Sequence, residues 1–180
     1  MSGDFSRISF DPQNDFSGVL LQQGRVHLDS EWNEQVAQVV RRFQAGTLDT
    51  LGRAVVPRET RDGFKILATG GKLTIGPGRI YVDGLLAENH GASPQWNPVL
   101  AELTGTAPID YEKQPYLKKF DPLPAGGPHL VYLDVWQREV THLQQPSLIE
   151  KAVGVDTSLR LQTVWQVKVL PKVGASVDCS

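Results

Sequence analysis

The sequence places few residues where they could carry out catalysis. Its four histidines are scattered, and no two lie at the short spacings that a metal site on one element uses: His27, His90, His129 and His142. Cys179 lies near the end of the chain with no local base, so we expect an inert thiol rather than a nucleophile. The motifs GxSxG, HExxH and CxxC, the P-loop and the EF-hand loop are absent. The sequence therefore predicts no catalytic, cofactor-binding or metal-binding residue, and no enzyme.

Two pairs of carboxylates could in principle cleave glycosidic bonds, but their spacing is unfavourable. Asp134 and Glu139 are an odd number of residues apart, as are Asp83 and Glu88. On a strand, an odd separation puts two side chains on opposite faces. A hydrolase needs the two carboxyl groups within about 5–10 Å of each other. We therefore expect these carboxylates on solvated faces, and a hydrolase is the weakest of three functional hypotheses.

The tryptophans suggest packing or recognition rather than catalysis. We expect Trp136 and Trp165 in the core, because they lie on strand-like segments, and Trp32 as a core anchor on a helix. Trp96 lies in a proline-rich segment and is an interface candidate, because aromatic anchors are enriched at interfaces.

The first 28 residues read as an extended arm. Glycines and a proline interrupt every regular run, yet Phe5, Phe10 and Phe16 are spaced through it. These phenylalanines either tuck back onto their own domain or dock on a neighbouring subunit, each contributing roughly 1.5–3 kcal/mol if fully buried. We expect all three to be substantially buried in an assembly, and at least one to contact a different chain.

A helical segment follows at residues 29–52, with Asp29 or Ser30 as its cap. One apolar stripe runs along it: Trp32, Val36, Val39, Val40 and Phe43. Gly46 is expected to end or loosen the helix, leaving a second short turn at Thr47–Leu51.

The remainder, residues 53–171, reads as a β-rich domain. The apolar period changes to two from Phe64, with turns expected at Gly70-Gly71 and Gly76–Gly78. Strands are predicted at 64–69, 72–75 and 79–88, and again at 129–141 and 160–170. Residues 91–128 hold seven of the twelve prolines and read as a long surface excursion with one short strand near Ile109–Tyr111. We expect residues 172–180 to form a flexible tail. The fold class is α+β, mainly β: an antiparallel sheet or sandwich with an extended N-terminal arm and one principal helix.

Composition excludes several classes of protein. Eighteen basic and twenty acidic residues give a net charge of -2, which does not favour nucleic-acid binding. One cysteine excludes a disulfide within the chain. The N-terminus MSGDFSRISF lacks the apolar core of a signal peptide, and no apolar run is long enough to span a membrane. We therefore expect synthesis in the cytoplasm and no direct membrane insertion.

Three stretches resemble one protein family. They are MSGDFSR with Phe10–Gln35 (FDPQNDFSGVLLQQGRVHLDSEWNEQ), Pro77–Glu88 (PGRIYVDGLLAE) and Val131–Leu170. Together they are similar to the N-terminal module of an uncharacterised family found with bacterial contractile injection systems and phage-tail-like particles.

The resemblance implies a structural part that docks at the baseplate or fibre-attachment region of such a particle, through its arm and loops. The implied partners are other tail or baseplate proteins and copies of the chain itself. The particle would be cytoplasmic, membrane-associated or released. The alternative hypothesis is a carbohydrate-binding or surface-recognition module that uses Trp96 and neighbouring loops.

Overall fold

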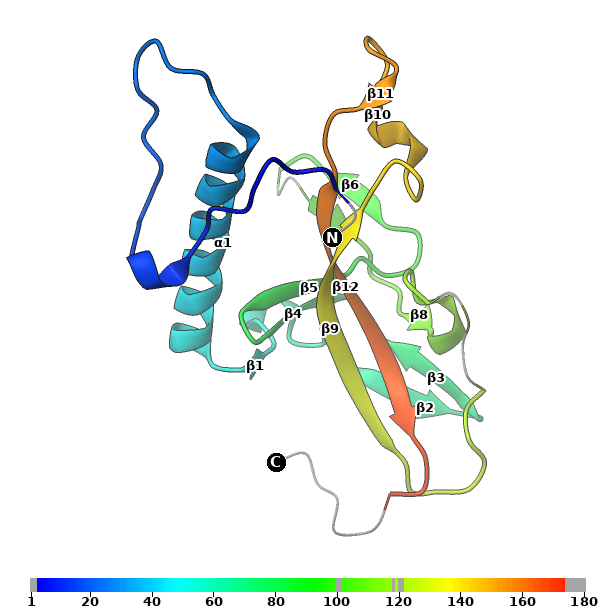
Figure 1. Ribbon diagram of the computed structural model, residues 1–180. Helices are drawn as coiled ribbons and strands as arrows, with labels where there is room; N and C mark the ends of the chain where they lie inside the picture. Colours follow the sequence, from blue (N-terminus) through cyan, green and yellow to red (C-terminus); the bar gives the residue numbers. More distant parts are fainter. Residues whose placement is uncertain (1–2, 100–101, 118, 120–121, 174–180) are drawn as a thin grey trace. The chain divides into compact units, whose positions relative to one another are not determined.

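The computed structural model describes residues 3–99, 102–117, 119 and 122–173 (Figure 1). The expectations for Cys179 and for most of the tail at 172–180 lie outside the described residues. Within them, one long α-helix accompanies short strands paired in small antiparallel sheets, so the predicted class, α+β and mainly β, is confirmed.

The helix and strands have these bounds: α1 Asp29–Leu51, β1 Ala54–Val55, β2 Ile66–Thr69, β3 Lys72–Ile75, β4 Gly78–Val82, β5 Leu85–Asn89, β6 Gln95–Asn97, β7 Glu102–Thr104, β8 Ile109–Asp110, β9 Leu130–Val140, β10 Ile149–Glu150, β11 Val155–Asp156 and β12 Arg160–Leu170. Among the described residues there are also four single 3-10 turns: η1 Pro12–Asn14, η2 Arg58–Thr60, η3 Tyr111–Lys113 and η4 Pro146–Leu148.

The chain divides into two compact units. Unit 1 contains residues 1–53 and 138–162, which include the arm, α1 and the β10–β11 hairpin. Unit 2 contains residues 54–137 and 163–180, which include β1 to β8. The paired strands β9 and β12 each contribute residues to both units.

Unit 2 is built from hairpins that glycines make possible. β2 and β3 pair from Ile66↔Ile75 to Thr69↔Lys72, and the turn between them has positive φ at both Gly70 and Gly71. β4 and β5 pair in the same way around Asp83 and Gly84, whose φ values are 46° and 79°. Asp-Gly is a favoured pair for this two-residue turn. The predicted single run at 79–88 is therefore two strands, a correction that the Asp-Gly signal explains.

The hydrophobic core lies in unit 2, on β3, β5, β8 and β12. Its buried members are Phe64, Leu73, Ile75, Ala87, Ile109, Tyr111, Trp165 and Val167. Trp165 packs edge-on against Phe64 with 4.8 Å between ring centroids, and its Nε1–H donates to the Glu88 carbonyl at 2.8 Å. The prediction that Trp165 is a core residue is confirmed.

Gln114, which is also buried, extends this core with polar contacts. Its Nε2 donates to the Tyr111 and Val167 carbonyls at 2.9 and 3.1 Å, and its Oε1 accepts from the Val167 N–H at 2.6 Å. One amide side chain therefore satisfies both backbone groups of a buried β12 residue, as a neighbouring strand would.

Trp136 is half-buried rather than fully enclosed. The Lys168 ammonium lies 5.6 Å from its ring centroid and 2.5 Å from the Asp134 carboxylate. The hydrogen bond to Asp134 raises the pKa of Lys168, against the opposing effect of its partial desolvation. The predicted solvated carboxylate at Asp134 is thus one partner of a part-exposed surface ion pair.

Candidate docking surface

Helix α1 starts where its sequence supplies negative charge. Asp29 and Glu31 lie in the first turn, where the helix dipole favours carboxylates, and the Glu31 carboxylate accepts from the Leu28 N–H at 3.0 Å. The cap residue is Leu28, not Asp29 or Ser30 as predicted, because the Asp29 carboxylate binds the arm instead. The helix also continues through Gly46 to Leu51 as one element, which corrects the predicted interruption.

The arm runs beside α1 and is fastened to it by polar contacts (Figure 1). The backbone N–H and the hydroxyl of Ser6 donate to the Asp29 carboxylate at 3.0 and 2.5 Å. Further along, the Ser9 hydroxyl donates to the Ser30 carbonyl at 3.2 Å, and the Val19 N–H donates to Gln35 Oε1 at 2.6 Å. The two bonds from Ser6 lower the pKa of Asp29 below its ordinary value.

The face of α1 that is buried in unit 1 is polar. Ser30 and Gln38 are its two buried residues, and Glu34, four residues from each, is half-buried. Residues spaced by four lie on one helix face. Gln38 Nε2 donates to Glu34 Oε1 at 3.1 Å, whereas Ser30 Oγ and Gln38 Oε1 are buried with no hydrogen-bond partner among the described residues.

The opposite face of α1 is apolar and open to solvent. Trp32 is 61% exposed and Phe43 74%, and the three valines between them are also exposed. We call this set the α1 face: Trp32, Val36, Val39, Val40 and Phe43. Trp32 is therefore not the core anchor that was predicted. Its ring lies edge-on to the His27 ring, with 6.2 Å between the ring centroids. The stripe was predicted correctly, but it points away from its own unit.

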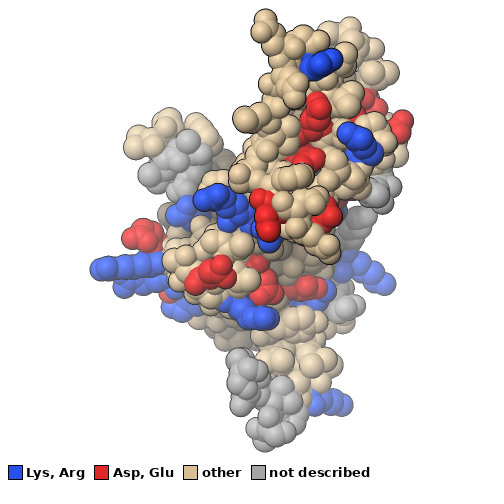
Figure 2. All heavy atoms as spheres, turned by 60° about the vertical axis from the view of Figure 1, so that its left-hand side comes forward, with Lys and Arg blue, Asp and Glu red and all other residues tan. Residues whose placement is uncertain are grey.

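Figure 2 is turned so that the left-hand side of Figure 1, where α1 lies, comes forward. Uncharged residues cover most of the nearest surface, with acidic and basic groups scattered among them. Beside the α1 face, an open groove of about 580 Å³ runs past Ser17 of the arm, Arg42, Phe43 and Leu51. The outward surface of α1 thus offers both an apolar strip and a depression.

Unit 1 has almost no apolar core of its own. Among the described residues, Val140 is its one buried apolar side chain, whereas the exposed ones include Leu20, Leu21 and Val26 of the arm. Ordering backbone costs about 1–2 kcal/mol per residue. Most large apolar side chains of this unit are exposed, so apolar burial within the unit offsets little of that cost.

The arm phenylalanines differ in their burial. Phe5 and Phe10 are half-buried, and Phe16 is 63% exposed. Gly3 is held between Phe5 and Leu159, so closely that an added Cβ would lie 2.6 Å from each side chain. Part of the arm therefore packs on its own unit. The predicted contact with a different chain stays a prediction, for which Phe16 is the most accessible of the three.

Trp96, the fourth predicted interface residue, lies in unit 2 on the β6–β7 hairpin, opposite Leu103. It is 61% exposed, as an interface anchor would be before its partner binds.

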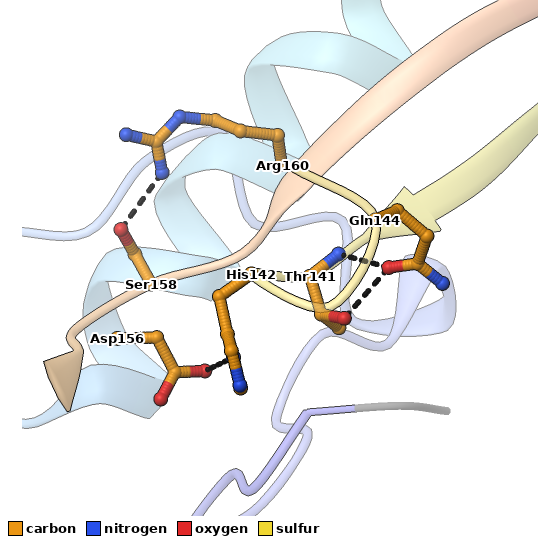
Figure 3. Close-up of polar contacts among 6 residues, drawn as sticks. All are labelled: Thr141, His142, Gln144, Asp156, Ser158 and Arg160. Carbon is orange, nitrogen blue, oxygen red and sulfur yellow. Dashed lines mark hydrogen bonds and ion pairs between the residues drawn. The ribbon is translucent and has the colours of Figure 1, made fainter. Parts of the chain in front are cut away.

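One polar cluster that sequence reasoning missed lies at the β10–β11 hairpin (Figure 3). His142 Nδ1 and Asp156 Oδ2 are 2.8 Å apart, and both side chains are part-exposed. The Ser158 hydroxyl does not complete a nucleophilic triad, because it accepts from Arg160 at 2.7 Å and Figure 3 shows it turned away from the imidazole. Asp156 lies 14 positions after His142 in the sequence, so only the hairpin brings the two side chains together.

A small cavity of about 270 Å³ lies in unit 2, next to η2, β4 and β5. Charged side chains of both signs line it, among them Glu59, Arg61, Arg79 and Glu88. Within the described part of the chain, no three histidine, cysteine or acidic side chains gather closely enough to hold a metal ion. Neither this cavity nor the His142 cluster presents a continuous row of exposed apolar side chains, as the α1 face does. We therefore take the α1 face as the candidate site.

The chain belongs to a family of unknown function, DUF6519, whose model matches residues 1–179. No curated protein and no solved structure matches the chain. Across the residues that the structure describes, no helix combines the length and apolar character needed to cross a membrane.

Proposed function

We propose that this chain is a non-enzymatic structural component of a phage-tail-like contractile injection system, which docks at the baseplate or fibre-attachment region through α1 and the arm. The proposed docking role rests on one observation, the orientation of α1. Its polar residues Ser30 and Gln38 are buried, whereas Trp32 and Phe43 face solvent. The assignment to a tail-like particle rests on the resemblance of the arm and the later strands to proteins of such systems.

The energetics favour docking as the purpose of this arrangement. An amphipathic helix normally turns its apolar stripe toward the core of its own domain. Exposing a tryptophan, a phenylalanine and three valines forgoes a burial free energy of roughly 1.5–3 kcal/mol for each large side chain. Contiguous exposed apolar patches of this kind mark protein interaction sites. The arm, fastened to the same helix through Asp29, presents Phe16 and Leu20 as further apolar contacts.

Incorporation into particles tests the proposal. Particles would be purified from cells that make the wild-type chain, a Phe43→Asp variant or a Leu143→Asp control. Leu143 is an exposed leucine of the same unit that lies off the helix. We expect the wild type and the control to co-purify in a fixed ratio to the tail proteins, and Phe43→Asp to be lost from particles while remaining folded. Absence of the wild-type chain from purified particles would defeat the assignment.

Recognition of a surface glycan is the second candidate function, and the exposed ring of Trp96 favours it. A tryptophan face on a hairpin can stack on a sugar ring. Binding to a glycan array that disappears in Trp96→Ala, and persists in Phe43→Asp, would support this role over docking through α1.

A further inference from the structure

We propose that α1 pairs with α1 of a second copy of this chain, antiparallel, across a two-fold axis between Ala37 and Gln38. This inference rests on the proposed docking role of the α1 face and names its partner. It follows from the spacing, the sizes and the charges of the side chains on α1.

The spacing fits a partner helix. Trp32, Val36, Val39 and Phe43 follow one another at intervals of four, three and four residues. Apolar residues that alternate between intervals of three and four form the narrow seam through which two helices interdigitate. All four are exposed along one side of a single uninterrupted helix. A seam of this kind selects another helix rather than a sheet or an irregular loop.

The sizes along the seam are self-complementary. Its two ends are aromatic and its two inner positions are valines. When a second α1 is laid antiparallel about the axis between Ala37 and Gln38, Trp32 of each copy faces Phe43 of the other, and Val36 faces Val39. An interface around a two-fold axis requires this property, because each contact must occur twice with the two chains exchanged.

The charges select the antiparallel orientation. The first half of α1 carries only acidic charges, Asp29, Glu31 and Glu34, and the pair Arg41-Arg42 follows the midpoint. Antiparallel pairing places the acidic half of one helix beside the arginines of the other, and it also opposes the two helix dipoles. Parallel pairing would place like charges side by side.

Sedimentation of the purified full chain tests the pairing without any particle. We expect a mass near twice 19.8 kDa at micromolar concentration for the wild type. Val36→Asp should weaken the dimer by at least about 30-fold, because it puts a charge at the centre of the seam. Leu143→Asp, which adds the same charge off the helix, should leave the dimer intact. A wild-type chain that stays monomeric up to millimolar concentration overturns the pairing.

Cysteine cross-linking then tests the orientation, in a Cys179→Ser background. Trp32→Cys chains mixed with Phe43→Cys chains should form a disulfide dimer, whereas neither variant should do so alone. In the antiparallel pair, the two copies of position 32 lie about 16 Å apart along the axis, beyond the ~7 Å Cα separation that a disulfide spans. Cross-linking of Trp32→Cys with itself would indicate a parallel pair and contradict the proposal.

The outcomes separate this inference from the proposed function. A monomer in solution that still enters particles overturns the self-pairing and leaves the docking role standing, with a tail protein as the occupant of the α1 face. A dimer that is missing from purified particles supports the pairing and defeats the assignment to the particle. A monomer whose Trp32 is shielded from acrylamide quenching would mean that another part of the same chain covers the α1 face, which also overturns the pairing.

Discussion

The Ser6 hydroxyl donates a 2.5 Å hydrogen bond to the carboxylate of Asp29, and so ties the arm to the first residue of α1. Ser6 lies 23 positions before Asp29, and the chain between them forms the rest of the arm before α1 begins. The N–H of Ser6 donates to the same carboxylate. A single ionised group therefore anchors the start of the arm.

Acid should release this anchor. Because the folded state lowers the pKa of Asp29, the anchor contributes stability above the ordinary aspartate pKa of 3.8 and loses it as the pH falls below that value. Hydrogen exchange of the Ser6 amide should accelerate below about pH 4 in excess of the intrinsic rate. Asp29→Asn should show faster exchange already at neutral pH and no such acid step. An unchanged protection of Ser6 through that range would show that Asp29 does not hold the arm.

Removal of an unpaired buried hydroxyl should stabilise the chain. Ser30 Oγ is buried without a hydrogen-bond partner among the described residues, and such a group costs about 1–3 kcal/mol. We expect Ser30→Ala to raise the free energy of unfolding of the isolated chain by about 1 kcal/mol, measured by urea denaturation. A loss of stability of similar size would mean that the hydroxyl has a partner in solution.

Two glycines with equal space around them should respond oppositely to alanine. A Cβ at Gly46 or at Gly71 would meet nothing within 4 Å, but only Gly71 has a positive φ, of 77°. Gly46→Ala should stabilise the helix by about 0.5–1 kcal/mol, because alanine loses less backbone freedom there. Gly71→Ala should destabilise the β2–β3 hairpin by about 1 kcal/mol through backbone strain. Thermal unfolding of the two variants measures the contrast, and equal shifts of the same sign would contradict it.

Trp165 should be the most sensitive position of unit 2. Trp165→Phe removes the hydrogen bond to the Glu88 carbonyl and part of the edge-on contact with Phe64. We expect a loss of about 2–4 kcal/mol in the free energy of unfolding, since a part-buried carbonyl loses its donor and a cavity opens. Trp96→Phe, at an exposed position, is the matched control and should change stability by less than about 0.5 kcal/mol. Similar losses in both variants would show that Trp165 is not the core anchor.

Truncation of the arm should separate folding from assembly. Without residues 2–16 the chain loses the Ser6 anchor and all three arm phenylalanines, Phe5, Phe10 and Phe16, but no member of the unit 2 core. We expect its near-ultraviolet circular dichroism from Trp165 and Tyr111 to persist while its incorporation into particles falls. Normal incorporation of the truncated chain would contradict a docking role for the arm.

Local sequence signals were sufficient for much of the fold. The strand at 72–75 and the turn at Gly70-Gly71 were predicted with the bounds that the structure has, because a period of two and paired glycines specify a hairpin within a few residues. The helical segment was predicted to begin at residue 29, where α1 begins, although its cap is Leu28 and not Asp29 or Ser30. The turn at Asp83-Gly84 was not predicted, although the Asp-Gly pair is an equally local signal. The predicted interruption of the helix at Gly46 was wrong, because α1 continues through that residue to Leu51.

The apolar stripe of α1 could be identified from local periodicity, because a period near 3.6 fixes which residues share a helix face. The direction in which that face points depends on the packing of unit 1. Periodicity gives only the orientation of the residues relative to one another, so Trp32 was interpreted as a core anchor. In the structure, hydrogen bonds from Ser6, Ser9 and Val19 hold the arm against α1, and the polar face of the helix is the buried one. The pairing of His142 with Asp156, which are 14 positions apart, likewise depends on the hairpin that lies between them.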